Sequence, residues 1–327
     1  MIKKQLPNKI IIAHLCLLGA GIIWAAAGPL IKITLGYIPP ATFLFLRFLI
    51  VAIVLLPYTV FELLKTKIDP KDYLNLFILG VLSQTAILII FISHKYADVL
   101  DITIIGVMGA VLSVYLGHYF YKDKIDSKLT FGLILASIGT LIIVIEPLLI
   151  NGANMADLKE KLLGNFLAIV YNIAWIAFLL FSKMCMGEKS EELKKDLKFL
   201  HIRPMTKAYS STLITSLSFY VGLITILPFM LWEYFSTGST FDIFSIGSVG
   251  LFGLLYMAIL SSIVAYMLYE YGLEYAKVSD TAIYGYLQPI LTLPFAYYLV
   301  GETPNEYMLL GGLIITIGVV IAEARKS

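Results

Sequence analysis

Long apolar runs separated by short polar stretches recur along the whole chain. Each run reaches the roughly 20 residues that cross a hydrocarbon core as a helix. The composition agrees, because 59% of the residues are hydrophobic, 14% are charged and the mean hydropathy is +0.88. We therefore expect an all-α membrane protein with ten transmembrane helices. The predicted spans are 10–32, 40–61, 72–93, 99–120, 129–150, 163–184, 210–232, 248–270, 280–300 and 306–323.

The distribution of basic residues predicts the orientation of these spans. Of the 24 Lys and Arg residues, 19 fall in the two terminal segments and in the loops after the even-numbered spans. The loops on the other side hold only four. Because cytoplasmic loops carry an excess of Lys and Arg, we expect a multi-pass protein of the cytoplasmic membrane with both termini in the cytoplasm. A secretory signal is not expected, since the first apolar run is long and lacks a convincing cleavage site.

An internal repeat is visible when the chain is compared with itself. The segment KYADVLD (95–101) aligns with EYAKVSD (274–280), and the register continues without a gap. In this register, which we call the main register, Gly139 meets Gly318. Such internal symmetry is typical of transporters that are built from structural repeats.

The repeat divides the chain into two halves of five spans, residues 1–155 and residues 156–327. Slightly different registers support it: LPYTVFE (56–62) matches LPFMLWE (227–233), and Trp24 matches Trp175. Because five is odd, the second half enters from the opposite side, so we expect inverted repeats around a central cavity. The second half also carries a basic insertion at about 187–208, which we interpret as a cytoplasmic surface helix.

Three stretches resemble the drug/metabolite transporter superfamily, in particular its EamA-type members. They are GIIWAAAGPLIKITLGYIPPATFLFLRF (21–48), LTLPFAYYLVGE (291–302) and GGLIITIGVV (311–320). The resemblance covers nearly the whole chain, although YKDK stands in the first half where Gly-Glu is expected. It implies a ten-helix carrier, mostly an exporter of amino acids or other small metabolites, with a cavity between the halves. It does not identify the solute.

Two prolines lie inside the ninth predicted span, Pro289 and Pro294. A helix proline removes one backbone hydrogen bond, and the freed carbonyl is tolerated mainly where it faces protein or water. The same span carries a polar stripe with one residue every four positions, which includes Tyr284 and Gln288. We therefore expect this span to border a cavity. A simple packing kink is the alternative.

Other spans contribute aromatic and polar side chains at helical spacing. Trp24 and Trp175 are expected to form cavity walls or, alternatively, to fill gaps between helices. Glu270 is a functional candidate because a carboxylate inside a span is costly, but it lies near a span end and is equally expected to reach the interface. The candidate solute-binding residues are Trp24, Arg47, Tyr171, Asn172, Trp175, Tyr266, Glu270, Tyr284 and Gln288.

Three further ionisable residues lie in or near the spans. Arg47 lies inside the second span and has two interpretations. It is expected either to bind a solute carboxylate or to extend outward as a structural anchor. Because an arginine at this place belongs to the general family resemblance, the anchor is favoured. Asp101 begins the fourth span and is interpreted as a helix cap. His94 is expected to be solvated near a span end. Proton coupling would need a buried group, for which Glu270, His14 and Asp101 are available, and the sequence leaves it open.

The sequence gives no sign of enzyme chemistry, since it contains no Walker loop, HExxH motif or nucleophile elbow. No cofactor, metal ion or nucleic-acid partner is expected. The expected partners are the lipid bilayer and a small-molecule solute, and a homodimer is left open. We expect a secondary transporter, an exporter or exchanger that moves a small polar metabolite such as an amino acid or related zwitterion by alternating access. The alternatives are a membrane-embedded lipid-modifying enzyme and a non-transporting receptor or scaffold.

Overall fold

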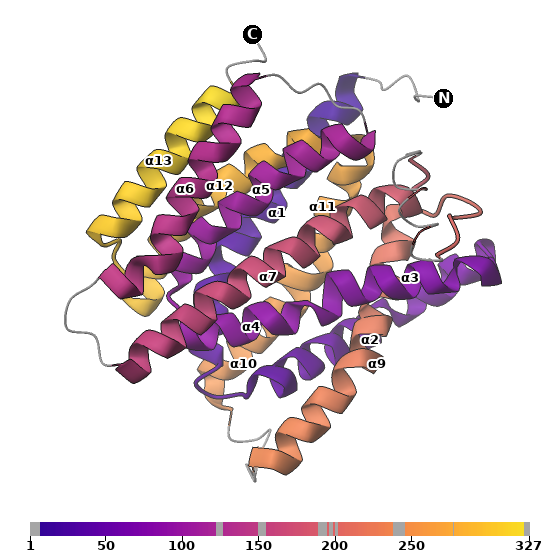
Figure 1. Ribbon diagram of the computed structural model, residues 1–327. Coiled ribbons are helices and arrows are strands. Elements are labelled where there is room, and N and C mark those ends of the chain that lie inside the picture. Colours follow the sequence, from indigo (N-terminus) through magenta and orange to yellow (C-terminus); the bar gives the residue numbers. More distant parts are fainter. Residues whose placement is uncertain are drawn as a thin grey trace.

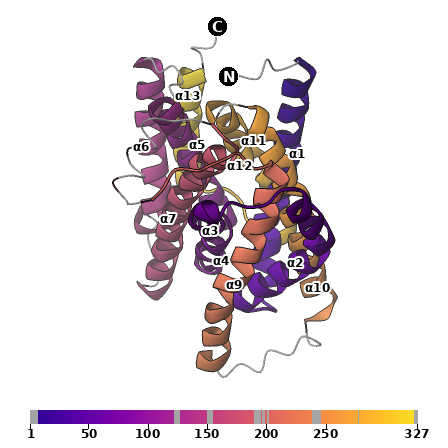
Figure 2. The ribbon, with the colours of Figure 1, turned by 90° about the vertical axis from the view of Figure 1, so that its right-hand side faces the viewer.

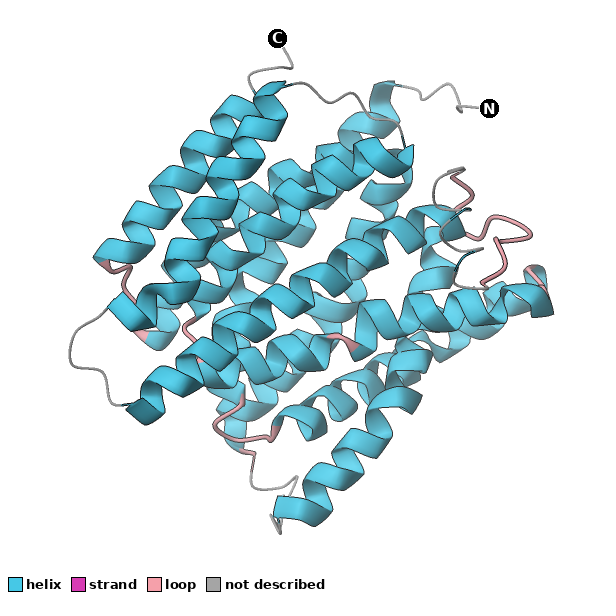
Figure 3. Cartoon of the chain, in the orientation of Figure 1, coloured by secondary structure: helices cyan, strands magenta, loops and turns pink. Residues whose placement is uncertain are grey.

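The computed structural model describes residues 7–121, 127–149, 155–188, 202–237, 246–276 and 278–323, together with Lys195 and Phe199. Within these ranges the regular secondary structure is entirely helical (Figure 3). The α-helices are α1 (Pro7–Thr34), α2 (Pro40–Lys65), α3 (Tyr73–Gly80), α4 (Ile87–Tyr96), α5 (Val99–Tyr121), α6 (Ser127–Leu149), α7 (Met155–Cys185), α9 (Ser211–Thr237), α10 (Gly247–Leu255), α11 (Ala265–Tyr275), α12 (Val278–Val300) and α13 (Glu306–Glu323). Half of the basic insertion lies outside the described residues, and so do Asp123 and the side chain of Asp280.

Helical segments lie in all of the predicted span ranges, and seven are long and apolar enough to cross a membrane. These seven are Lys9–Thr34, Pro40–Lys65, Pro70–Tyr96, Val99–Tyr121, Asp157–Cys185, Ser211–Ser236 and Gly247–Tyr275. Shorter apolar segments, Thr130–Glu146 and Glu306–Gly318, lie in α6 and α13. The protein is therefore a multi-pass, all-α membrane protein.

Two long helices change to π geometry in the middle. Segment η2 (Val81–Thr85) joins α3 to α4, and η4 (Tyr256–Val264) joins α10 to α11. A π turn widens the helix by one residue and is frequent at functional sites. Helix α12 is continuous, with Pro289 and Pro294 inside it. Proline is tolerated there since neighbouring groups in a membrane bundle can satisfy the freed carbonyls.

The helices form a bundle in which α1 begins and α13 ends at the same end (Figures 1 and 2). We call this end the terminal face and the other end the opposite face. Helix α6 packs along α13, α5 along α12, and α2 along α9. The contact between α6 and α13 is close because glycines face backbone: a Cβ atom at Gly139 would lie 2.6 Å from the carbonyl oxygen of Gly311. Small residues at such interfaces let membrane helices approach closely.

The largest apolar core lies among α1, α2, α4, α7, α9 and α11. Its fully buried rings include Phe43, Phe48, Phe91, Phe178 and Phe219. Many other large apolar side chains remain exposed, for example along the outer sides of α2, α9 and α13. On a helix bundle of this hydropathy, such surfaces are the ones expected to contact lipid.

Candidate functional site

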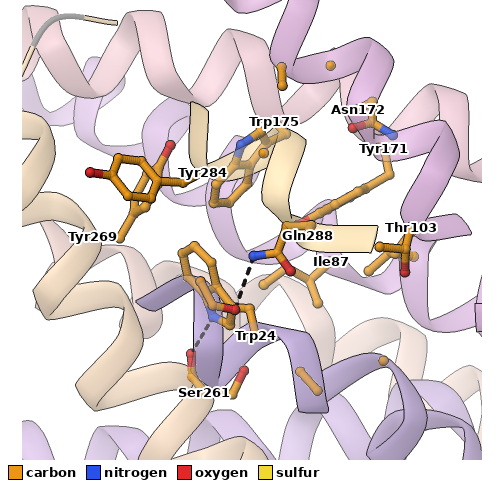
Figure 4. Close-up of a pocket in the computed structure, with 18 of the residues that line it drawn as sticks. Trp24, Ile87, Thr103, Tyr171, Asn172, Trp175, Ser261, Tyr269, Tyr284 and Gln288 are labelled. Carbon is orange, nitrogen blue, oxygen red and sulfur yellow. Dashed lines mark hydrogen bonds between the residues drawn. The ribbon is translucent and has the colours of Figure 1, made fainter. Parts of the chain in front are cut away.

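A cavity of about 270 Å³ lies inside the bundle, bordered by α1, α2, α4, α5, α7, η4, α11 and α12. Figure 4 shows side chains from several of these helices converging on it. The structure brings together eight of the nine predicted residues in its lining, namely Trp24, Arg47, Tyr171, Asn172, Trp175, Tyr266, Tyr284 and Gln288. The prediction that α12 borders a cavity is therefore confirmed.

The two tryptophans of the lining and two of its tyrosines, Tyr266 and Tyr269, form an aromatic cluster. The rings of Trp24 and Trp175 meet edge to face, with centroids 5.6 Å apart. Tyr266 and Tyr269 lie 5.3 Å and 5.1 Å from the Trp24 ring. The Trp24 indole also donates a hydrogen bond to the carbonyl oxygen of Ser261 at 3.1 Å, as seen in Figure 4. These residues both line the cavity and pack against one another. The tryptophans therefore form cavity walls and also fill space between helices.

Polar side chains on α12 and α7 connect the cavity wall to neighbouring helices. The Gln288 amide donates to the carbonyl oxygen of Gly21 on α1 at 3.1 Å, which fixes α12 against α1. Tyr284 is hydrogen-bonded to Nδ1 of His14 at 2.8 Å. Asn172 lies against Gly109, where a Cβ atom would come within 2.5 Å of its amide oxygen. Glycine at this position therefore makes room for the Asn172 amide beside α5.

Arg47 points into the bundle and lines the cavity. Its side chain is only 2% exposed, and its Nε donates a hydrogen bond of 2.6 Å to the hydroxyl of Ser262 in η4. Its guanidinium carbon lies 5.8 Å from the ring centroids of both Phe48 and Phe91. The expectation that Arg47 extends outward as an interfacial anchor is wrong, because η4 and α4 enclose the side chain.

Glu270 is the predicted site residue that the structure does not place in the cavity lining. Its carboxylate is 2% exposed and accepts a hydrogen bond of 2.7 Å from the Ser182 hydroxyl on α7. It therefore does not reach the interface either. Tyr266 lies one turn earlier on the same side of α11 and does line the cavity, so hydropathy and helical spacing do not distinguish the two residues.

Charged residues gather near the opposite face, beside the cavity. Lys161 on α7 pairs with Asp98 at 3.0 Å, Asp101 at 3.3 Å and Glu146 at 3.0 Å. Burial opposes ionisation of Asp98, but the ammonium groups of Lys161 and Lys32 outweigh it and hold the pKa of Asp98 below its usual value. Asp101 is fully buried and paired with Lys161, which corrects the prediction that it serves as a helix cap.

The cap of α5 comes instead from Glu302, the last residue of the LTLPFAYYLVGE stretch, for which no capping role was predicted. Its two carboxylate oxygens accept hydrogen bonds from the backbone N–H groups of Val99 and Leu100, each at 3.1 Å. The same carboxylate receives the Lys32 ammonium at 2.7 Å. A carboxylate at a helix N-terminus is stabilised by the free N–H groups and by the helix dipole. Glu302 therefore joins the end of α12 to α1 and α5.

His94 corrects another expectation, since it is buried rather than solvated. Its ring is 4% exposed and lines the cavity, and its Nδ1 has no hydrogen-bond partner among the described residues. The sequence contained a signal for this position. Ile87, Phe91 and His94 recur at i, i+4 and i+7 and so share one face of α4, and all three line the cavity.

The fold and the cavity can be compared with known proteins. The model of the EamA-like transporter family matches residues 11–145 and 198–323. The chain belongs to this family. The family consists of transporters rather than enzymes. A helix bundle around an aromatic and polar cavity agrees with that function.

Two relatives of this EamA-like chain match over almost their full length. An uncharacterised transporter of Archaeoglobus fulgidus is 26% identical over 314 residues, which cover 96% of this chain and 98% of the relative. A probable amino-acid metabolite efflux pump of Salmonella typhimurium is 25% identical over 304 residues, with 92% and 91% covered. A solved crystal structure of a protein, only 15% identical, superposes with a TM-score of 0.62 over 95% of this chain and 97% of the other. That likeness supports the fold alone.

Proposed function

We propose that this EamA-like protein is a secondary transporter that exports or exchanges a small zwitterionic metabolite, such as an amino acid, across the cytoplasmic membrane by alternating access. The observation that carries the proposal is the cavity of about 270 Å³ in the bundle, lined by aromatic rings, amides and one guanidinium. Its lining in the described residues contains no Asp or Glu, so a polycation finds no partner there. Two of the family relatives are named as probable amino-acid metabolite efflux pumps, which supports the solute class.

We further propose ten membrane-spanning helices in two inverted repeats, residues 1–155 and 156–327, with a pseudo-twofold axis in the membrane plane. Contacts between equivalent residues support it, because a residue near a twofold axis meets its own counterpart. Trp24 touches Trp175. Phe48 touches Phe219, its counterpart in the register that aligns LPYTVFE with LPFMLWE, with ring centroids 5.7 Å apart.

The α6–α13 interface supports the same axis. Gly132 and Gly139 correspond to Gly311 and Gly318 in the main register. A Cβ atom at Gly139 would meet the Gly311 carbonyl oxygen at 2.6 Å, and one at Gly318 would meet the Gly132 carbonyl oxygen at 2.6 Å. Reciprocal contacts of this kind are expected when two equivalent antiparallel helices face each other across the axis.

Two equivalent lysines support alternating access. Lys32 donates to the carbonyl oxygen of Ala97 at 3.3 Å, and its counterpart Lys183 donates to that of Ala276 at 2.7 Å. Ala97 and Ala276 are themselves equivalent in the main register. Because the halves are inverted, the two bonds lie at opposite ends of the bundle. Lys32 is also joined to Glu302 across the halves, and at the Lys183 end Asp72 joins Thr206 and Tyr209 across the halves. Each end therefore has its own contacts between the halves, and alternating access would exchange them.

The test is counterflow in liposomes that contain the purified protein. Vesicles preloaded with one unlabelled L-amino acid are diluted into a trace of the same labelled compound, and protein-dependent accumulation is measured. We expect transient accumulation of at least one zwitterionic amino acid, because a carrier exchanges solute without an energy source. Empty liposomes serve as the control. Absence of accumulation for all standard amino acids would contradict the proposed function.

A further inference from the structure

The Arg47 guanidinium is a buried cation without an acidic partner. Nε is satisfied by Ser262, but neither terminal nitrogen has a hydrogen bond or ion pair with another described residue. Three lysines that are largely covered by the bundle behave differently: Lys32, Lys161 and Lys183 each pair with at least one carboxylate. A buried charge is costly unless it is paired and hydrogen-bonded, so the open side of Arg47 is where an anion would be stabilised most.

Ser262 holds the guanidinium in a defined orientation. Its hydroxyl donates to the carbonyl oxygen of Met257 at 2.8 Å and accepts from Arg47 Nε at 2.6 Å. The first of these bonds lies inside the π-helical segment η4. Because Nε is fixed to η4, the remaining N–H donors are directed as a fork, the geometry that matches a carboxylate.

The neighbouring aromatic cluster places a second constraint on the ligand. Tyr266 lies beside Arg47 in the lining and contacts the ring of Trp24 at 5.3 Å and that of Trp175 at 6.3 Å. The charged end of the cavity and its aromatic walls are thus adjacent. A solute that uses both carries a carboxylate next to an apolar or aromatic group, and an ammonium group can face the rings.

The repeat indicates that there is one such site in the cavity. The register that pairs Phe48 with Phe219 also pairs Arg47 with Ser218. Ser218 is buried, and its hydroxyl donates back to the carbonyl oxygen of Ile214 at 2.8 Å. The second half therefore supplies no matching cation, and a dicarboxylate would place its second charge against neutral groups.

We propose that Arg47 is the specificity-determining residue that binds the single carboxylate of the solute, so that the cavity selects monocarboxylates with an apolar or aromatic side chain. This inference rests on the proposed function and specifies the substrate class of the same cavity. Removing either the carboxylate or the guanidinium fork weakens binding by about tenfold or more, since a hydrogen bond to a charged group is typically worth about 1.5–3 kcal/mol.

The experiment compares matched ligands on the wild-type protein. Thermal unfolding of the purified protein is followed with L-phenylalanine, L-leucine and L-threonine, each beside its carboxamide, and counterflow is measured for the same compounds. We expect L-phenylalanine or L-leucine to raise the melting temperature and to be transported. Their carboxamides, which keep the ammonium group and the side chain, are expected to bind at least about tenfold more weakly.

Variants of Arg47 test whether the preference for the acid over the carboxamide depends on this residue. Arg47→Lys keeps the charge and loses the fork, Arg47→Gln loses both, and Arg203→Gln removes an exposed arginine outside the cavity as a matched control. We expect both Arg47 variants to bind the acid about as weakly as the amide, while Arg203→Gln keeps the wild-type preference. If the Arg47 variants do not fold, the acid–amide comparison on the wild type decides alone.

The outcomes separate the two proposals. Equal binding and transport of acids and amides would overturn the role of Arg47 and leave the transporter function intact. Retention of the full preference for the acid by a folded Arg47→Gln protein would do the same. If no acid in the panel binds, the inference fails, and counterflow over all standard amino acids then shows whether the proposed function fails with it.

Discussion

At the scale of single residues, the polar side chains of the cavity lining differ in how they are satisfied. In a hydrocarbon environment a polar group is stabilised when it bonds inside the bundle, and two amides of the lining do so. Asn172 bonds back to its own helix, and Gln288 bonds to α1. Arg47 and His94 are the exceptions among the cavity residues discussed above, and each has a nitrogen without a described partner.

Trp175 is the residue whose loss should affect transport most clearly without a change in charge. Its ring contacts Trp24, Tyr266 and Tyr269, and such pairs are worth about 0.5–1.5 kcal/mol each. We expect Trp175→Ala to reduce counterflow at least several-fold while the protein still inserts in the membrane. The matched control is Trp232→Ala, since Trp232 is 71% exposed on α9.

Gln288→Leu tests the polar wall in the same assay, because it removes the hydrogen bond to Gly21 and an amide from the lining. We expect it, too, to weaken transport several-fold, whereas Thr316→Val on the exposed side of α13 should be neutral. If both the Trp175→Ala and the Gln288→Leu proteins transport the solute at the wild-type rate, at equal protein abundance, the solute does not pass through this cavity.

At the scale of helices, close packing depends on which glycine faces which neighbour. Gly311 and Gly312 are adjacent in α13, yet their surroundings differ. A Cβ atom at Gly311 would lie 2.6 Å from Cγ1 of Ile143 and 2.8 Å from the Gly139 carbonyl oxygen, whereas one at Gly312 would meet no atom within 4 Å. The sequence shows two identical neighbouring glycines, and only the packing of α6 against one of them distinguishes the two positions.

This difference predicts opposite outcomes for two neighbouring substitutions. Gly311→Ala should push α6 and α13 apart and cost about 1–3 kcal/mol, since overpacked interfaces relax only partly. Gly312→Ala should leave stability unchanged or raise it slightly, because alanine is the better helix former. The melting temperatures of the two purified variants, measured in one detergent, provide the comparison. Equal melting temperatures would show that the α6–α13 contact is looser than described.

At the scale of the whole molecule, the helix order places the beginning of α1 and the end of α13 at the same face. The excess of basic residues in the segments expected at that face predicts that it is cytoplasmic. Lys95 and Lys207 report on the two sides, since Lys95 lies in the last turn of α4 near the opposite face and Lys207 precedes α9.

The predicted topology can be tested by labelling single cysteines in intact cells. With Cys16 and Cys185 replaced, we expect Lys95→Cys to react with a membrane-impermeant maleimide from outside. Lys207→Cys should react only after the membrane is opened, because its side is cytoplasmic in the predicted orientation. Both side chains are exposed, so reactivity reports the side of the membrane rather than burial. Reaction of Lys207→Cys from outside would reverse the orientation.

Local properties of the chain were enough to predict the helices and most of the cavity. Hydropathy and length depend on consecutive residues, so the sequence predicted a helix in each span range, from residues 10–32 to residues 306–323. Trp24, Trp175 and Gln288 were found because an aromatic or amide group at helical spacing in an apolar run is costly unless it faces protein or solute.

Tertiary structure decided the properties that depend on a neighbour far away in the sequence. Glu270 and Tyr266 lie one turn apart on the same side of α11, but the first is bonded to Ser182 and the second borders the cavity. Glu302 caps α5 although it lies in the other half of the chain from Val99, and no local pattern carries that pairing. Arg47 was recognised as unusual from its position in a span. Its orientation toward the cavity was set by η4 and α4, because the burial of a side chain is a property of the helices packed around it.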